Sequence, residues 1–150
     1  QTLRDVRERM GLDGNAKMSK SRGNAIGLFE TKEQVWDKLR PAVTDPKRVK
    51  KTDPGTPEVC NIYHLHKAFS PAATVENVVK QCTTAGWGCI DCKKVLHENM
   101  EIELTPIRRR YEELNAKPKI VDDALSAGTA HCSKIAKQTL RDVRERMGLD

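Results

Sequence analysis

Apolar residues recur every three or four positions along most of the chain, which is the spacing of one face of an α-helix. In the stretch 31–40, Val35 and Leu39 share a face, and Thr31 with Gln34 has the spacing of a helix capping box. No stretch shows a convincing alternation of apolar and polar residues, the pattern of a half-buried strand. The sequence therefore predicts a mostly α-helical protein, folded as a helical bundle.

Prolines, threonines and glycines mark where the predicted helices begin and end. Pro41 ends the first helix, and Thr56 with Pro57 offers a cap and a first helical position for the next one. We expect a third helix to begin at Thr74 and to end at Gly86.

Two longer helices are predicted in the second half of the chain. One begins near Cys89, and Pro106 within it predicts a kink, while Pro118 begins the last helix. The apolar stripes that we expect to face the core consist of Leu96, Met100, Leu104, Ile107, Tyr111 and Leu114 in the first helix, and Val121, Leu125, Ile135, Leu140, Val143 and Met147 in the second.

Composition narrows the class of protein and of partner. The 150 residues suit one ordinary domain, and the net charge of +6 with a pI near 9.1 favours nucleic acid or another polyanion as partner. No apolar run reaches the length of a membrane span, and no signal peptide opens the chain. We therefore predict a cytoplasmic protein without a membrane partner.

The two ends of the sequence are identical. Residues 1–13, QTLRDVRERMGLD, recur letter for letter as residues 138–150. Copies of an old structural repeat would have diverged, so we expect a recent duplication, a misjoined sequence or an assembly artefact. In this interpretation, residues 1–10 are a misplaced copy of the C-terminal helix.

Four of the five cysteines have a spacing that suits a metal. Cys60, Cys82, Cys89 and Cys92 are arranged as C-x21-C-x6-C-x2-C, and a C-x2-C pair at a helix start places two sulfurs about one turn apart. Four thiolates could hold a zinc ion or an iron–sulfur cluster, and the spacing alone leaves both open, as well as buried inert thiols. The fifth, Cys132, is predicted to be a packed free thiol.

A short basic loop lies near the start of the chain. Residues 11–24, GLDGNAKMSKSRGN, are bounded by glycines and hold two lysines and two serines close together. Ammonium groups, hydroxyls and backbone N–H groups are good ligands for phosphate oxygens. The alternative is a solvated basic loop without a ligand.

Five sequence blocks, taken together and in order, resemble the C-terminal portion of a bacterial tryptophanyl-tRNA synthetase. The resemblance begins near Gly11 and runs to the end of the chain. KMSKS is shared by class I synthetases, and the AVTDP, DPG and GCIDCKK segments distinguish the tryptophan enzyme from its tyrosine relative. The blocks are KMSKSRGNAIGL, AVTDPKR, DPGTPEVCNIYHLHKAFS, GCIDCKKVL and LTPIRRRYEEL.

The resemblance implies an activity and a role for the KMSKS loop. That family activates tryptophan with ATP and Mg²⁺ and transfers it to the tryptophan tRNA. Lys17 and Lys20 would act as catalytic cations on the ATP phosphates, where negative charge develops on the leaving pyrophosphate. Gly14 and Gly23 would let the loop move. The ATP-binding set that the resemblance implies is Lys17, Met18, Ser19, Lys20 and Ser21.

The resemblance also bears on the cysteines and on RNA binding. A subset of the family carries a 4Fe-4S cluster on a similar cysteine pattern, and for this reason we favour that cluster over zinc. The first gap of the family pattern is one residue longer than the gap between Cys60 and Cys82 here. The helical part would then bind the anticodon region of the tRNA, although a solvated helix face is the alternative for its arginines. A second basic run, at Lys47, Arg48, Lys50 and Lys51, has the same two interpretations. The RNA-binding candidates are Lys93, Lys94, Arg108, Arg109 and Arg110.

The expected domain organisation follows the resemblance. We expect 1–10 to be the duplicated helix, 11–30 to be the KMSKS loop at the end of a catalytic domain, and 31–150 to be the helical domain with the four-cysteine site. The family's Rossmann-type catalytic half and its main dimer interface are not in the sequence, so we expect this chain alone to be inactive. The full enzyme would be a homodimer. Alternatives are a non-catalytic RNA-binding module with an iron–sulfur or zinc site, and a thiol-rich metal or redox protein.

Overall fold

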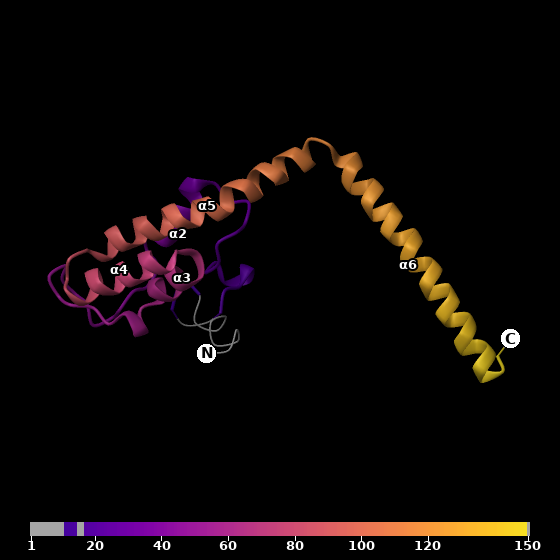
Figure 1. Ribbon diagram of the computed structural model, residues 1–150, viewed down its shortest axis with the longest axis horizontal. Helices are drawn as coiled ribbons and strands as arrows, with labels where there is room; N and C mark the ends of the chain where they lie inside the picture. Colours follow the sequence, from indigo (N-terminus) through magenta and orange to yellow (C-terminus); the bar gives the residue numbers. More distant parts are fainter. Residues whose placement is uncertain (1–10, 15–16, 150) are drawn as a thin grey trace. The chain divides into compact units, whose positions relative to one another are not determined.

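The computed structural model describes residues 11–14 and 17–149 of the chain. Every regular element among these residues is a helix, so the predicted mostly α-helical fold is confirmed. The duplicated segment 1–10 lies outside the described residues. In chain order, the elements are the 3-10 helix η1 (Lys20–Arg22), α2 (Lys32–Leu39), the 3-10 helix η2 (Pro57–Val59), α3 (Asn61–Phe69), α4 (Ala72–Thr83), α5 (Cys89–Asn115) and α6 (Pro118–Met147) (Figure 1).

The chain divides into two units at residue 108. The first unit, residues 1–108, contains the loop near the N-terminus, helices α2 to α4 and most of α5. The second unit, residues 109–150, contains the end of α5 and α6. The domain boundaries that we predicted from the sequence, at residues 10 and 30, stay predictions.

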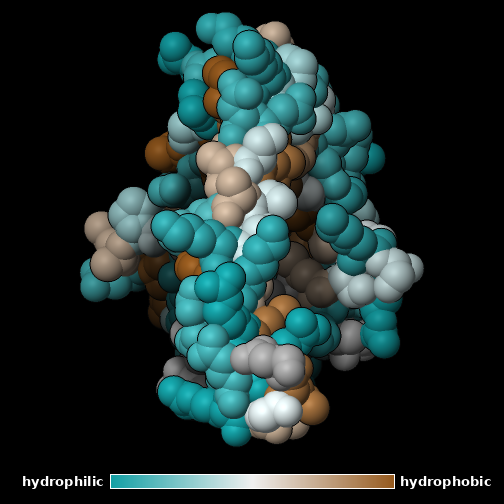
Figure 2. Space-filling model, turned by 90° about the vertical axis from the view of Figure 1, so that its right-hand side faces the viewer, coloured by the Kyte–Doolittle hydropathy of each residue, from teal (hydrophilic) through white to brown (hydrophobic). Residues whose placement is uncertain are grey.

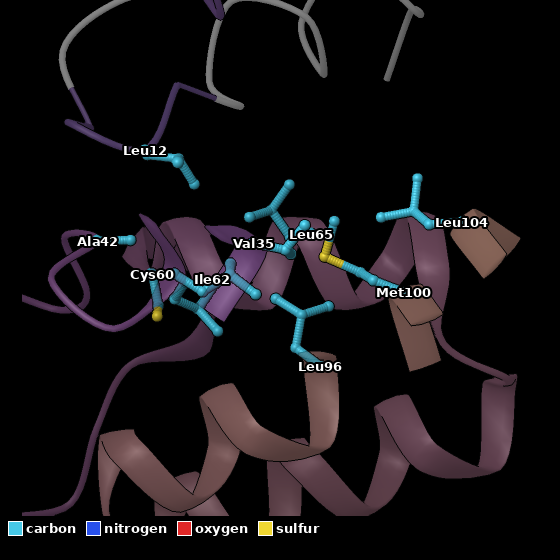
Figure 3. Close-up of a cluster of buried hydrophobic side chains, with 10 residues drawn as sticks. Leu12, Val35, Ala42, Cys60, Ile62, Leu65, Leu96, Met100 and Leu104 are labelled. Carbon is cyan, nitrogen blue, oxygen red and sulfur yellow. The ribbon is translucent and has the colours of Figure 1, made fainter. Parts of the chain in front are cut away.

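The hydrophobic core of the first unit lies where α2, α3 and α5 meet, and Figure 3 shows its side chains gathered between these helices. Val35, Leu65 and Leu96 contribute from one helix each and are fully buried. Burial of a side chain of this size stabilises a fold by about 1.5–3 kcal/mol. The buried cluster consists of Leu12, Val35, Leu39, Ala42, Cys60, Ile62, Leu65, Leu96, Met100 and Leu104.

Helix α2 begins as the sequence predicts. The Thr31 hydroxyl accepts a hydrogen bond from the Gln34 N–H at 3.3 Å, and the Gln34 side-chain oxygen accepts one from the Thr31 N–H at 2.8 Å. The two bonds satisfy N–H groups that a helix start leaves unpaired. The helix ends at Leu39, just before Pro41.

Helix α3 begins four residues later than predicted. Residues from Pro57 form the short 3-10 turn η2, in which the Cys60 N–H donates to the Pro57 carbonyl at 2.9 Å. Cys60 is then extended (φ −89°, ψ 119°), which separates η2 from the first residue of α3, Asn61. The proline therefore starts a tighter turn and not the α-helix itself.

Helix α4 also differs from the prediction at both ends, whereas α5 begins at Cys89 as predicted. Helix α4 starts at Ala72, directly after Pro71, and it ends at Thr83. Ala85, and not Gly86, has a positive φ of 55° there, in the left-handed region that does not continue a helix. Helix α5 passes through Pro106 and continues to Asn115.

Helix α6 is a single helix of 30 residues that ends at Met147, and Gly148 caps it with a φ of 66°. We predicted that the apolar stripe of this helix faces the core, and for the described residues this prediction is wrong. The six side chains of the stripe, from Val121 to Met147, are 42–65% exposed. Ile107 and Tyr111 of α5 are exposed as well. No described helix combines the length and the apolar character needed to cross a lipid bilayer.

Candidate functional site

The KMSKS loop presents its two lysines to solvent. Lys17, Lys20 and Ser21 are exposed, and the Ser19 and Ser21 hydroxyl oxygens lie 2.9 Å apart. Met18 points the other way and packs against the hydrophobic core. The loop therefore has an apolar anchor on one side and positively charged groups on the other.

Asn24 holds the loop in shape from within. Its side chain is 4% exposed, and its oxygen accepts a hydrogen bond from the Ser19 N–H at 2.8 Å. Its amide nitrogen donates to the Asp13 carboxylate at 3.0 Å and to the Lys17 carbonyl at 3.4 Å. One buried amide thus fixes the backbone on both sides of Met18, a role that the sequence alone did not reveal.

Backbone hydrogen bonds connect the base of the loop to the core. The Leu12 N–H donates to the Asn24 carbonyl at 3.0 Å, and the Val43 N–H donates to the Leu12 carbonyl at 2.9 Å. Gly14 and Gly23 have φ values of 70° and 66°, which glycine adopts without strain. These two predicted flexing points are therefore the turns where the loop leaves and rejoins its base.

The four cysteines of the C-x21-C-x6-C-x2-C pattern line a single cavity of about 20 Å³. Cys60 precedes α3, Cys82 lies near the end of α4, and Cys89 and Cys92 occupy the first turn of α5. The first unit of the chain thus brings together residues that are up to 32 positions apart in the sequence. The other residues that line the cavity are Thr44, Arg48, Ile62, Val78 and Trp87.

A glycine allows Cys82 to approach the chain closely. The Gly55 N–H donates to the Cys82 carbonyl at 2.9 Å, and a β-carbon on Gly55 would lie 2.6 Å from the Cys82 sulfur. Only glycine therefore fits at this position without a shift of the neighbouring chain. This contact is a structural reason for the glycine of the DPG segment, which the sequence analysis noted only as part of the family resemblance.

Burial favours the protonated form of three cavity thiols, Cys60, Cys82 and Cys92. It raises the pKa of Cys60 and of Cys82, and it raises the pKa of Cys92 from 9.0 to about 12, with a smaller contribution from the neighbouring cysteines. A metal ion at the cavity would have the opposite effect, because coordination deprotonates a thiol. In the described residues, however, no group of three or more His, Cys, Asp or Glu side chains already has the arrangement of a metal site.

Two residues lie beside the cysteines that the sequence did not link to them: Arg48, predicted only as part of a basic run, and His66. The Arg48 Nη1 lies 3.9 Å from the Cys89 sulfur. The fully buried His66 places its Nε2 3.5 Å from the Cys92 sulfur and 3.2 Å from the Cys92 carbonyl oxygen. Burial lowers the pKa of His66. Neither residue has a spacing relative to the cysteines that would have identified it.

The basic candidates for RNA binding fall into two groups. Lys93 is 4% exposed, and its ammonium donates to the carbonyls of Arg40 at 2.7 Å and Ala42 at 2.6 Å. Arg108 donates to the Glu30 carbonyl at 2.7 Å and pairs with the Glu101 carboxylate. Both cations therefore have partners inside the protein.

Lys94, Arg109 and Arg110 are exposed. The two arginines pair with Glu113 at 3.3 and 3.1 Å, and their side chains remain 82% and 66% exposed. Figure 2 shows that the face turned to the viewer is predominantly hydrophilic, with scattered apolar side chains. Such exposed ion pairs contribute little to stability, so these arginines can exchange a carboxylate for a phosphate.

Cys132 does not match its prediction. It lies on α6 and is exposed, where we expected a packed thiol. The small residues around it suggested a packed helix face, but no residue of α6 in the described structure is buried.

Comparison with known proteins identifies relatives along most of the sequence. The chain is 48% identical over 138 residues to the tryptophan–tRNA ligase of Deinococcus radiodurans, and 39% identical over 140 residues to that of Thermotoga maritima. Each alignment covers at least 92% of this chain but 42% of the relative. The chain thus spans less than half the length of these relatives.

Solved structures give the same result. The tryptophanyl-tRNA synthetase of Campylobacter jejuni, solved in complex with ADP and tryptophan, superimposes with a TM-score of 0.82 at 30% identity, covering 94% of this chain and 43% of that one. The enzyme of Aeropyrum pernix superimposes with a TM-score of 0.63 over 70% of this chain. The family model described as tRNA synthetases class I (W and Y) matches residues 7–105. The chain belongs to the class I tRNA synthetases of the tryptophan and tyrosine group.

Proposed function

We propose that this chain serves tryptophan–tRNA ligation, the ATP-dependent activation of tryptophan and its transfer to tRNA. The observation that carries this proposal is the 48% identity to a tryptophan–tRNA ligase over 92% of the chain. The exposed lysines of the KMSKS loop and the exposed cations of α5 supply the chemistry that ATP and tRNA require. The activity belongs to the cytoplasm, and the full enzyme would act as a homodimer.

In the proposed reaction, Lys17 and Lys20 bind the phosphates of ATP together with Mg²⁺. Both ammonium groups are exposed on a loop whose shape Asn24 fixes from behind. Positive charge at this position stabilises the leaving pyrophosphate more strongly in the transition state than in bound ATP. Ser19, Ser21 and the backbone around Met18 supply further hydrogen bonds to the phosphate oxygens.

We further propose that the four-cysteine cavity holds a metal group, with a 4Fe-4S cluster favoured over zinc. Four sulfurs, one from the residue before α3, one from α4 and two from α5, line one small cavity, and the set of donors suits either group. The metal would deprotonate the thiols and join the starts of α3 and α5 to the end of α4. Its role would be structural, and Lys94, one of the cations that we propose for tRNA binding, follows Cys92 by two residues in α5.

A chimera tests the proposed activity. Residues 17–149 would replace the corresponding segment of the Deinococcus radiodurans ligase, and tryptophan-dependent exchange of pyrophosphate into ATP would be measured. We expect activity, and we expect Lys20→Met to lower it by about a hundredfold. Lys32→Met, which removes another exposed lysine outside the loop, is the control.

The chain alone provides the second test. We expect it to bind the tryptophan tRNA with an affinity that falls steeply with salt, and Lys94→Gln to weaken the binding. An inactive chimera together with tight tRNA binding would favour the non-catalytic RNA-binding module. A chain that neither binds tRNA nor supports the chimera would contradict the proposal.

A further inference from the structure

Arg48 is the one positively charged side chain among the described residues that line the cysteine cavity. The remaining non-cysteine neighbours are a threonine, two aliphatic residues and a tryptophan. Apolar walls of this kind raise the cost of any net charge inside the cavity. Whatever charge the cavity carries must therefore be balanced largely by this one guanidinium.

Hydrogen bonds fix the Arg48 guanidinium beside the sulfurs. Its Nη2 donates to the Trp87 carbonyl at 2.6 Å and to the Lys51 carbonyl at 3.0 Å, and its Nη1 lies 3.9 Å from the Cys89 sulfur. The Nε atom is buried and has no partner within the described part of the chain. The guanidinium is thus held in place by two carbonyls while its other N–H groups remain available to a negatively charged acceptor.

A metal group in this cavity would create such an acceptor. Four thiolates around zinc, or around a 4Fe-4S cluster, leave a surplus of about two negative charges. A surplus charge in an apolar cavity is costly unless a cation lies close by. Lys93 donates to two carbonyls and does not line the cavity, whereas Arg48 lines it and has its Nη1 3.9 Å from the Cys89 sulfur, so Arg48 is the better placed cation.

We propose that Arg48 is a positioning residue of the four-cysteine site, donating an N–H···S hydrogen bond to the Cys89 thiolate and balancing the charge of the bound metal group. The inference rests on the proposed metal site. It adds to that site a residue from outside the cysteine pattern, on the loop between α2 and η2. Arginine suits the role because its planar group can contact two carbonyls and a sulfur at once.

Metal titrations of the whole chain test the role. The metal-free chain would be titrated with Zn²⁺ alone, and separately with Fe²⁺ and sulfide, for the wild type, Arg48→Met and Arg48→Lys. We expect Arg48→Met to weaken metal binding by about tenfold, as the loss of a partner of a metal ligand does. Arg48→Lys should recover part of the loss, because lysine keeps the charge but not the planar group.

Lys47→Gln is the matched control, because it removes a positive charge from the same loop without touching the cavity. Melting temperatures with and without metal separate a metal-directed role from a merely structural one. We expect Arg48→Met to reduce the rise in melting temperature that metal produces. If Arg48 only holds the loop, the substitution will lower both melting temperatures equally and leave metal affinity unchanged, which would overturn the inference.

The two proposals fail in different ways. A wild-type chain that takes up neither Zn²⁺ nor iron with sulfide overturns the metal site, and the role of Arg48 with it. A wild-type chain that binds metal while both Arg48 variants bind it equally well overturns the role of Arg48 alone. Should Arg48→Met not fold, the comparison of Arg48→Lys with Lys47→Gln still decides the question.

Discussion

Gly55 is in direct contact with Cys82, one of the residues that line the cysteine cavity. The Gly55 N–H donates to the Cys82 carbonyl at 2.9 Å, and its α-carbon faces the Cys82 sulfur so closely that a β-carbon would stand 2.6 Å from it. The position of one of the four thiols therefore depends on the absence of a side chain 27 positions earlier in the sequence.

Gly55→Ala should consequently displace Cys82 and destabilise the chain by about 1–3 kcal/mol, the usual cost of overpacking a buried site. Urea unfolding of the metal-free chain measures this loss, and metal titration should show weaker binding as well. Gly128→Ala is the control, because nothing lies within 4 Å of its β-carbon and alanine favours the helix there. Equal stability of the wild type and Gly55→Ala would show that the contact relaxes freely.

Lys93→Met should destabilise the chain, because it leaves the carbonyls of Arg40 and Ala42 without a donor. A buried carbonyl that loses its partner costs about 1–3 kcal/mol. The same substitution at the exposed neighbour, Lys94→Met, should leave the unfolding free energy unchanged and weaken tRNA binding instead. The reverse outcome, with Lys93→Met affecting only RNA binding, would contradict the internal role of this lysine.

Asn24→Ala should loosen the KMSKS loop without unfolding the chain. The Ser19 N–H loses its acceptor, and loss of one such hydrogen bond corresponds to about a tenfold change in local opening. Hydrogen exchange at the Ser19 amide measures the effect. Ser21→Ala is the control, since the Ser21 hydroxyl contacts the Ser19 hydroxyl and not its amide. Unchanged exchange in Asn24→Ala would mean that other contacts hold the loop.

Iodoacetamide should react first with Cys132, which is exposed, and more slowly with Cys60, Cys82 and Cys92. Burial and a raised pKa both reduce the thiolate that reacts. Mass spectrometry of peptides from the native metal-free chain would follow each site, and Cys132→Ser should remove the fast phase. Rapid modification of Cys92 in the native chain would show that the cavity opens readily.

The metal-free chain should lose stability as the pH rises above about 9. The pKa of Cys92 is raised to about 12 in the folded chain, whereas its ordinary value is 9.0. Between these values the unfolded chain has lost the proton and the folded chain has kept it, so the unfolding free energy falls as the pH rises. Below about pH 9 both states are protonated, and this contribution is fully present.

Urea unfolding under reducing conditions, at several pH values between about 8 and 11, measures this slope. Cys92→Ala should have a shallower slope than the wild type, and Cys132→Ser should keep the wild-type slope. Parallel curves for the wild type and Cys92→Ala would show that Cys92 ionises as readily in the folded chain as in the unfolded one.

Local chemistry explains which features could be predicted from the sequence. The capping box of Thr31 and Gln34 depends on residues three apart, and it is present as predicted. The start of α3 was misplaced because Pro57 fits a 3-10 turn as well as an α-helix. The stripe along α6 shows which residues share a face, but periodicity does not say what covers that face.

In the candidate sites, only the residues that sequence spacing or family resemblance indicates could be predicted. The cysteine pattern indicated residues that the fold does bring to one cavity, yet Arg48, His66 and Gly55 could not be found in that way. Their roles depend on contacts between segments distant in sequence. Lys93 is the opposite case. The sequence made it a candidate for RNA binding, but tertiary packing buries it, and no local pattern reveals that packing.

Cys60 belongs both to the hydrophobic core and to the wall of the cysteine cavity. Since only the fold brings the four cysteines together, a group bound there is bound more tightly by the folded chain than by the unfolded one, and by mass action it raises the free energy of unfolding. Heating and the removal of the bound group by a chelator would then both shift the equilibrium between the folded and the unfolded chain toward the unfolded chain. The lifetime of this domain would follow the supply of whatever occupies the cavity.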